Sequence, residues 1–229
     1  MTSDQVPARS DPRDPRHSGE RPRRPLVVGC LISGGGRTVL NLADRIEAGT
    51  LPARIGVVIA HRREIAGVAR CEARGLPVVV IPTGPACDDR VDATLAAANV
   101  ELVCLCGYLR RFRVATRWNG RTINIHPSLL PAFGGSGMYG DRVHAAVIAA
   151  GAAESGCTVH VVDEEYDRGP VLLQRRCSVL PGDDPHALAA RVFALEVEAL
   201  PEVIRGIAVG ELPLPLTRDA RIGRGSIEP

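Results

Sequence analysis

The sequence predicts an α/β protein built on one doubly wound, mostly parallel sheet. Nearly continuous apolar runs alternate with helical patterns between residues 26 and 126. Such runs are typical of strands that are covered on both faces, as they are in a parallel sheet. The regular β-α-β rhythm is the pattern of a doubly wound fold.

The first half of the chain predicts five strands and three helices. The strands are expected at residues 26–32, 55–60, 78–81, 102–106 and 122–126, and the helices at 38–48, 64–74 and 88–98. Aromatic residues make up only 3% of the chain. The predicted core therefore consists of Val, Leu, Ile and Ala side chains.

The pattern changes after residue 126. A loop with four glycines is expected at 132–140, followed by a helix at 142–150 that Asp141 is placed to cap. Strands at 157–162 and 170–179 flank a turn. The last helix is expected at 185–207, with its apolar stripe formed by Leu188, Val192, Leu195 and Ala199.

A single domain is expected over residues 25–212. Residues 1–24 are rich in Arg, Pro, Asp and Ser, which predicts a disordered tail. Residues 213–229 form a second tail, rich in Pro and Arg. The N-terminus lacks the apolar stretch of a secretory signal, and no run is long enough to span a membrane. These features predict a cytoplasmic protein without a membrane partner.

Charge and cysteine usage exclude several classes of function. The formal net charge is only +2, so we expect no nucleic-acid partner. The chain has no lysine, which excludes a P-loop lysine and a lysine Schiff base. Its seven cysteines show no CxxC or paired Cys/His ligand spacing, so no metal site is expected. They are typical of small buried residues in a reducing compartment.

A candidate reaction centre combines an amide, an imidazole and a carboxylate. Asn124 and His126 are two residues apart, so in a strand their side chains point to the same face. Pro127 favours extended geometry at His126, which places these groups at the strand's tip. Asp167 lies in a Gly- and Pro-containing turn, from which it is expected to approach the imidazole and raise its basicity. Such a set suits acyl transfer.

Two glycine-rich loops and two further histidines each allow alternatives. Residues 33–38 are expected to form either a phosphate cradle at a helix N-terminus or a plain tight turn. The loop at 134–140 is expected to be either a mobile lid or a surface connection. We expect His144 to be a surface residue, and His160 to be a hydrogen-bonded core histidine.

Two motifs resemble those of the folate-dependent formyltransferases, across about residues 26–212. The first is Asn124-Ile125-His126-Pro127-Ser128-Leu129-Leu130-Pro131, and the second is the 156–160 segment that leads to Asp167-Arg168-Gly169-Pro170. The 32–38 loop resembles the phosphate loop of the members that formylate glycinamide ribonucleotide. The resemblance implies a Rossmann-like formyltransferase fold and formyl transfer from 10-formyltetrahydrofolate, the co-substrate, to that ribonucleotide in purine biosynthesis. It implies no metal.

The resemblance also implies roles for individual residues. Asn124 and His126 would stabilise the tetrahedral oxyanion, and Asp167 would pair with His126. The remaining implied positions hold the ribonucleotide phosphate (Gly36, Arg37 and Thr38), its glycinamide part (Glu196) and the folate (Leu109, Arg110, Val162 and Asp163).

This chain departs from the family pattern in three places. Arg37-Thr38 stands where the family usually has Ser-Asn, the 131–144 segment is longer, and only Arg90 is a candidate for an arginine of the shortened 81–88 region. The alternatives are a 10-formyltetrahydrofolate hydrolase, a sugar-nucleotide formyltransferase and, from another class, a non-catalytic phosphoribosyl-binding protein. Either a monomer or a homodimer fits the sequence.

Overall fold

The computed structural model describes residues 24–217 and 219–221. The predicted N-terminal tail lies outside the described residues except for Arg24, and so do residues 218 and 222–229 of the predicted C-terminal tail. In the described part of that segment, Leu216 and Ala220 are buried, and the Leu216 N–H donates to the Gly120 carbonyl at 2.6 Å. The division into one domain and two tails stays a prediction.

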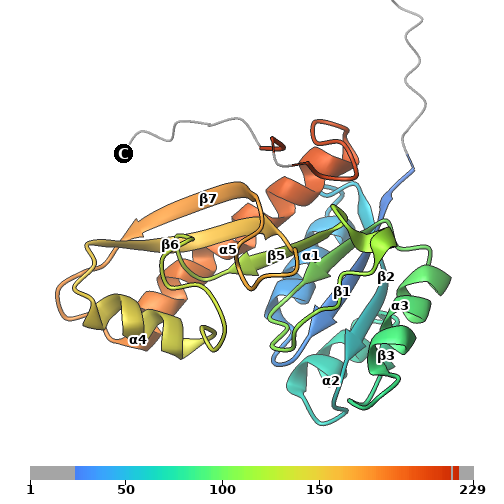
Figure 1. The fold of residues 1–229 in the computed structure, drawn as a ribbon, viewed down its shortest axis with the longest axis horizontal. Helices are drawn as coiled ribbons and strands as arrows, with labels where there is room; N and C mark the ends of the chain where they lie inside the picture. The colour runs from blue at the N-terminus through green and yellow to red at the C-terminus, as the bar shows by residue number, and fades with distance from the viewer. Residues whose placement is uncertain (1–23, 218, 222–229) are drawn as a thin grey trace, which may run out of the picture.

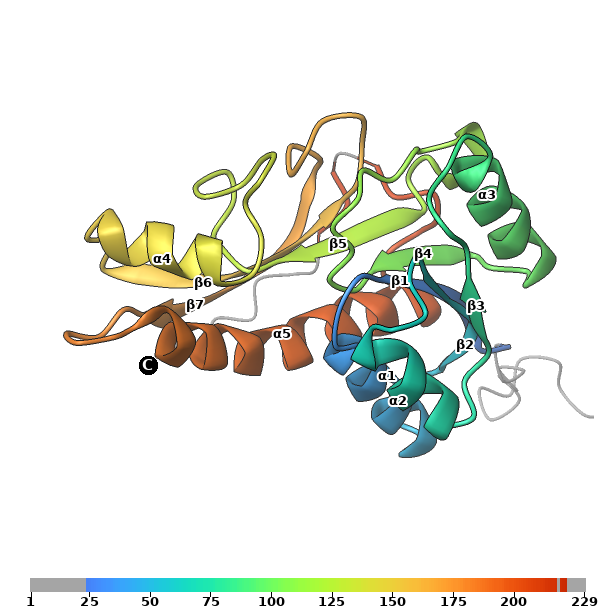
Figure 2. The same cartoon turned by 90° about the horizontal axis from the view of Figure 1, so that it is seen from below.

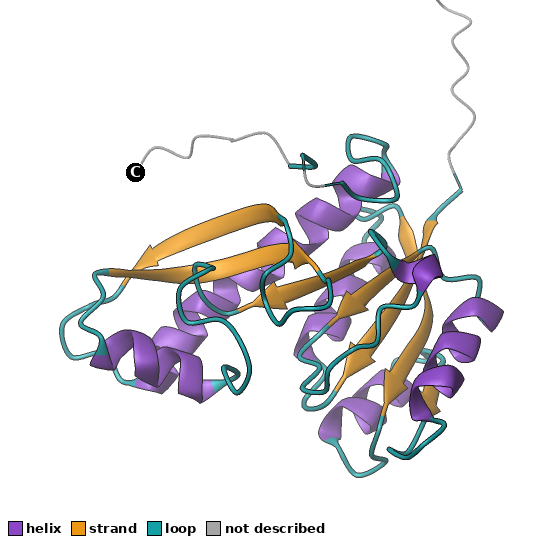
Figure 3. Ribbon diagram, viewed as in Figure 1, coloured by secondary structure: helices purple, strands orange, loops and turns teal. Residues whose placement is uncertain are grey.

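A seven-stranded sheet with the order β3-β2-β1-β4-β5-β6-β7 runs through the molecule (Figures 1 and 3). Its strands are β1 (Leu26–Ile32), β2 (Ala53–Ala60), β3 (Val78–Val80), β4 (Leu102–Leu105), β5 (Thr122–His126), β6 (Glu154–Val161) and β7 (Val171–Ser178). All pairs from β3 to β5 are parallel, whereas β6 and β7 are antiparallel to their neighbours. The predicted doubly wound, mostly parallel α/β fold is confirmed.

Helices cover both faces of the parallel part of the sheet. One face packs against α1 (Arg37–Glu47), α2 (Ala66–Ala73) and the long α5 (Pro185–Ala208). The opposite face packs against α3 (Cys87–Ala97) and the 3₁₀ turn η2 (Thr116–Trp118). Figure 2 shows α1, α2 and α5 on one side of the strands and α3 on the other. Two separate hydrophobic cores result, one on each face.

The crevice of such a fold is expected where the strand order reverses. Chain connections run outward from β1 to β2 and β3 on one side, and to β4 and β5 on the other. The loops that follow β1 and β4 therefore run in opposite directions from the carboxyl ends of these two adjacent strands. The glycine-rich turn after β1 and the loop after β4 lie at this point.

The start of α4 (Asp141–Ala149) differs from the prediction. Its N-cap is Gly140, at φ 55°, and no side chain caps it. Asp141 is thus not the cap but the first residue of the helix, where its negative charge still complements the helix dipole. In the predicted stripe of α5, Leu195 is only partly buried, whereas the other three residues are fully buried.

Six of the seven cysteines are buried, and all seven are free thiols. This confirms that they act mainly as small core residues. Among residues 24–217 and 219–221, no helix combines the length and apolar character that crossing a bilayer requires.

Close packing between α2 and the 33–36 turn fixes the shape of that turn. Gly67 donates its N–H to the Gly34 carbonyl at 3.0 Å. A Cβ atom at Gly67 would lie 2.5 Å from the Gly34 oxygen and 3.0 Å from the Gly36 nitrogen. Glycine is therefore required here by the approach of two backbones.

We expect Gly67→Ala to lower the free energy of unfolding by about 1–2 kcal/mol. Overpacking costs about 1–3 kcal/mol, and the better helix propensity of alanine offsets up to about 1 kcal/mol of it. Urea unfolding measures the change. Gly84→Ala is the control, because a Cβ there would meet no described atom within 4 Å. Equal stability of the two variants would contradict the packing argument.

Candidate active site

A cleft of about 700 Å³ opens at the carboxyl ends of β1, β4 and β5. The turn after β1, the loops after β4 and β6, and helices α4 and α5 form its walls. Every site residue predicted from the sequence lines this cleft: Gly36, Arg37, Thr38, Leu109, Arg110, Asn124, His126, Val162, Asp163, Asp167 and Glu196.

Strand pairing places three polar side chains on one patch of sheet. Asn124 and His126 project from the same face of β5, as predicted. The antiparallel register pairs Asn124 with His160 of β6, and His126 with Thr158. Directly opposed residues point to the same side of a sheet, so His160 joins the predicted pair.

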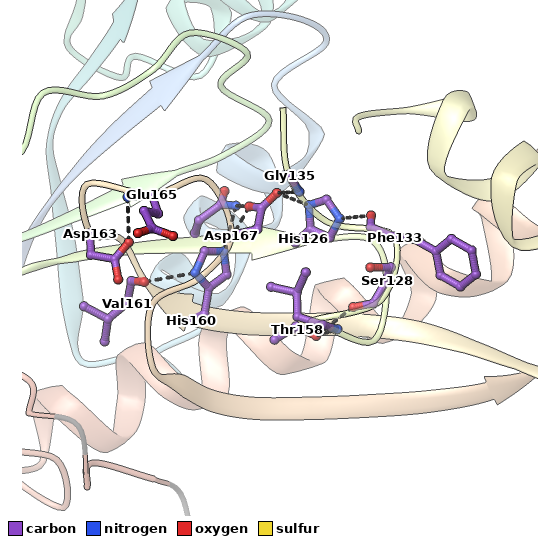
Figure 4. Close-up of polar contacts among 12 residues, drawn as sticks. His126, Ser128, Phe133, Gly135, Thr158, His160, Val161, Asp163, Glu165 and Asp167 are labelled. Atoms are coloured by element: carbon purple, nitrogen blue, oxygen red, sulfur yellow. Dashed lines mark hydrogen bonds and ion pairs between the residues drawn. The ribbon is translucent and has the colours of Figure 1, made fainter. Parts of the chain in front are cut away.

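Asp167 reaches this patch from the loop between β6 and β7 (Figure 4). Its backbone adopts the left-handed conformation, at φ 56°. One carboxylate oxygen accepts the Gly135 N–H at 2.8 Å and lies 3.5 Å from His126 Nδ1. The other lies 3.4 Å from His160 Nε2 and 3.5 Å from Asn124 Nδ2. The carboxylate thus contacts every other polar group of the patch.

These contacts keep Asp167 ionised. Burial raises its pKa, but the hydrogen bonds with His160 and the Gly135 N–H, and the positive charge of either histidine when protonated, more than offset this, so the pKa lies below its usual value. The side chain is 10% exposed. Asp167 is therefore a negative charge held at the floor of the cleft.

Contacts at both ring nitrogens define the proton state of His126. Nε2 lies 2.9 Å from the Phe133 carbonyl oxygen, which can only accept, so Nε2 carries a hydrogen. In the neutral ring Nδ1 carries a lone pair that faces the Asp167 carboxylate, so this contact becomes favourable only when Nδ1 takes up a proton. Burial lowers the pKa of His126, and Asp167 and the Phe133 carbonyl oppose this only in part. The prediction that Asp167 makes His126 more basic is therefore wrong. Desolvation of the ring outweighs the charge of Asp167, and the imidazole is neutral in the ligand-free protein.

His160 is buried and hydrogen-bonded, as predicted, but its partners belong to the site. Its Nδ1 donates to the Val161 carbonyl at 2.9 Å, and its Nε2 lies 3.1 Å from Asn124 Nδ2 and 3.4 Å from the Asp167 carboxylate. The second Asn124 N–H has only the 3.5 Å contact with Asp167. This long contact with Asp167 would have to give way for the N–H to donate to another atom in the cleft. The antiparallel register that reveals His160 is not readable from sequence alone.

The 33–38 turn forms one end of the cleft, at the N-terminus of α1. Gly36 is the N-cap of α1 at φ 71°, and no side chain caps the helix. The first N–H groups of α1 are therefore available to a ligand that carries negative charge. A Cβ at Gly36 would lie 3.0 Å from the Gly67 Cα, so α2 supports the turn from behind.

Glu196 of α5 lies in the same half of the cleft. Burial raises its pKa to about 7, although the charge of Arg37 opposes this shift. The Arg37 guanidinium lies over the Phe193 ring, 4.0 Å from its centroid. Glu196 therefore titrates near neutral pH, in the half of the cleft that contains the 33–38 turn.

The predicted folate positions line the opposite half. The Leu109 N–H donates to Ser33 Oγ at 3.0 Å, and its side chain is 53% exposed. Arg110 turns toward α3, where it lies 3.1 Å from Cys87 Sγ. Val162 and Asp163 begin the loop that carries Asp167. Two loops therefore bound this half of the cleft.

His144 of α4 is buried, so the prediction of a surface position is wrong. It lines the cleft, and no described atom satisfies its Nδ1. Burial lowers its pKa; Asp141 opposes this shift and His126 adds to it. Val143 and Val147, which are four residues apart and lie on either side of His144 in the sequence, are the apolar signal that this face of α4 is buried. The 134–140 loop also lines the cleft; its mobility stays a prediction.

The buried histidine predicts a pH-dependent stability. As pH falls through about 6.5, the unfolded chain protonates His144 before the folded protein does, so folding is penalised. In His144→Gln this penalty is absent. We expect the free energy of unfolding of the variant to rise relative to wild type between pH 7 and pH 5, by at most about 1.4 kcal/mol per pH unit. Urea unfolding at each pH measures it.

His186→Gln provides the control, because the His186 side chain is 82% exposed. That variant should follow the wild-type pH dependence. If the free energies of unfolding of His144→Gln and wild type changed with pH in parallel, His144 would not be the histidine that causes the pH dependence.

Comparison with known proteins agrees with this geometry. Residues 27–204 match the formyl transferase family. The chain is 41% identical over 193 residues to a chloroplastic phosphoribosylglycinamide formyltransferase of Vigna unguiculata, covering 81% of this chain but only 61% of that protein. A chloroplastic relative of the same name from Arabidopsis thaliana is 35% identical, with 83% and 68% covered.

A solved structure with the same architecture is glycinamide ribonucleotide transformylase 1 from Symbiobacterium toebii. It superposes with a TM-score of 0.78 at 34% identity, covering 86% of this chain and 93% of that one. Family match, identity and shared fold lead to one conclusion: the chain belongs to the formyl transferase family, among the phosphoribosylglycinamide formyltransferases.

Proposed function

We propose that this protein transfers the formyl group of 10-formyltetrahydrofolate to the amine of glycinamide ribonucleotide, a step of purine biosynthesis. The observation that carries the proposal is the meeting of Asn124, His126 and Asp167 in a cleft whose far end is a free helix N-terminus. Acyl transfer needs polar groups such as these three side chains at the reacting carbonyl. A phosphorylated acceptor needs an anion site such as the helix N-terminus.

The amine nitrogen attacks the formyl carbon, and a tetrahedral oxyanion forms. The Asn124 N–H that lies 3.5 Å from Asp167 turns to donate to this oxyanion, and one such donor contributes about 3–4 kcal/mol. His126 stabilises the developing charge. If its Nδ1 takes up a proton, the resulting N–H faces Asp167, while Nε2–H stays on the Phe133 carbonyl. The imidazolium would then have a partner at each nitrogen.

Collapse of the intermediate breaks the bond between the formyl carbon and N10 of the folate. The amine loses one proton and N10 gains one, so the reaction needs a proton carrier but no net acid or base. We propose that Asp167 assists this transfer through water, because its carboxylate is ionised and reaches both histidines. No metal step is part of the mechanism.

The two halves of the cleft divide the substrates. Gly36, Arg37 and Thr38 would hold the ribonucleotide phosphate at the start of α1, and Glu196 would contact the glycinamide part. The loops that carry Leu109, Arg110, Val162 and Asp163 would hold the folate. The acyl donor and acceptor would then meet at Asn124. We propose a cytoplasmic monomer or homodimer, with no nucleic-acid or membrane partner.

Purified protein should formylate glycinamide ribonucleotide when 10-formyltetrahydrofolate is supplied. Folate absorbance follows the turnover, and mass spectrometry identifies the formylated product. Turnover that needs no amine would instead indicate a hydrolase, and turnover only with an amino sugar nucleotide would indicate a sugar-nucleotide formyltransferase. Ribonucleotide binding without any turnover would indicate a phosphoribosyl-binding protein.

Asp167→Asn and His126→Ala should each lower kcat by about 10²- to 10⁴-fold, the usual contribution of groups that transfer protons or stabilise an oxyanion. Asparagine tolerates the left-handed backbone of residue 167, so the fold should persist, as circular dichroism can verify. Asp44→Asn and His186→Ala are matched controls at exposed positions. Near-normal kcat in either site variant would remove that residue from the proposed mechanism.

A further inference from the structure

Arg37 belongs to a row of contacts between α1 and α5. Arg37, Asn41 and Arg45 follow one another at four-residue spacing, which places them on one face of α1. Asn41 Nδ2 donates to the Val197 carbonyl at 2.9 Å, and Arg45 forms an ion pair with Glu198. These two contacts fix the orientation of α1 along α5.

At the cleft end of this row the Arg37 guanidinium stacks on Phe193, 4.0 Å from the ring centroid. A cation over an aromatic face is attracted by about 0.5–2 kcal/mol. The guanidinium is therefore held against α5, although its own helix begins at the 33–38 turn. Its position is set by this contact with α5.

Glu196 follows Phe193 by three residues, so both side chains lie on the same face of α5 and both line the cleft. Two groups on neighbouring elements interact electrostatically with the Glu196 carboxyl: Arg37 of α1 and Cys157 of β6. Burial raises the pKa of the Cys157 thiol to about 12, so this group is neutral. Among the described residues, Arg37, which stacks on Phe193 one helical turn before Glu196, is the cation whose charge acts on the Glu196 carboxyl.

We infer that Arg37 is a positioning residue that supplies the counter-charge for Glu196 and favours its carboxylate form in the ribonucleotide half of the cleft. A carboxylate only accepts hydrogen bonds, whereas a protonated Glu196 would also donate one. Ionised Glu196 therefore selects an acceptor substrate that presents N–H groups, such as an amine or amide. This inference rests on the proposed function, and it differs from the simpler role of Arg37 as a phosphate ligand.

The direct test measures the Glu196 titration in ligand-free protein. Carboxyl ¹³C NMR on protein labelled at glutamate follows each resonance, and Glu196→Gln identifies the one that belongs to Glu196. Arg37→Ser should raise the pKa of Glu196 by about one unit or more, because loss of a nearby opposite charge favours the neutral acid. Arg37→Lys should stay near wild type. Phe193→Leu should shift the pKa in the same direction as Arg37→Ser, by less.

Arg45→Ser is the matched control. It removes another cation from the row of contacts between α1 and α5, one that pairs with Glu198 and not with Glu196. It should leave the Glu196 titration in place. An unchanged Glu196 pKa in Arg37→Ser, or an equal shift in Arg45→Ser, would overturn the inference. Because no substrate is present, this result is independent of whether the proposed activity is found.

Kinetics give the functional readout once turnover is established. In Arg37→Ser the acidic limb of the pH profile of kcat/KM for the ribonucleotide should move to higher pH. The movement should equal the shift of the Glu196 pKa measured by NMR, and the pH profile of kcat/KM for the folate should stay unchanged. In the Glu196→Gln background, Arg37→Ser should add no further shift. A uniform loss of ribonucleotide affinity at every pH, without movement of the limb, would make Arg37 a phosphate ligand only.

Discussion

The buried carboxylate of Asp167 is the constraint on which the candidate site depends. A charge in this position is costly unless several partners compensate for it. Those partners come from three separate segments: Asn124 and His126 on β5, His160 on β6 and the Gly135 N–H on the 134–140 loop. Satisfying one carboxylate therefore fixes the relative positions of two strands and two loops, and the same contacts form the reaction centre.

Sheet topology explains why the cleft has two chemically different halves. The parallel strands converge on the reversal of strand order, where a free helix N-terminus meets the loop after β4. The change to antiparallel pairing at β6 then brings a second imidazole, His160, against Asn124. An uncapped helix N-terminus and a polar centre thus lie within a single cavity, an arrangement that suits the proposed transfer between two substrates.

Burial sets the protonation states within that cavity, and it acts in opposite directions on acids and bases. It lowers the pKa of His126 and so keeps the ring neutral, and it raises the pKa of Glu196 to about 7. Asp167 remains ionised because its local contacts outweigh burial. A neutral imidazole beside a fixed carboxylate is ready to accept positive charge, which is what stabilisation of an oxyanion intermediate needs.

The sequence by itself determined the alternation of strands and helices, the pair Asn124 and His126, and the approach of Asp167, because periodicity, two-residue spacing and turn composition are local properties. The family resemblance added the substrate positions. Only the tertiary structure decided that His160 joins the site, that His144 is buried and that Arg37 stacks on Phe193. Each of these depends on strand register or helix docking, which bring together residues that are distant in the chain, and on desolvation, which is a property of the folded molecule.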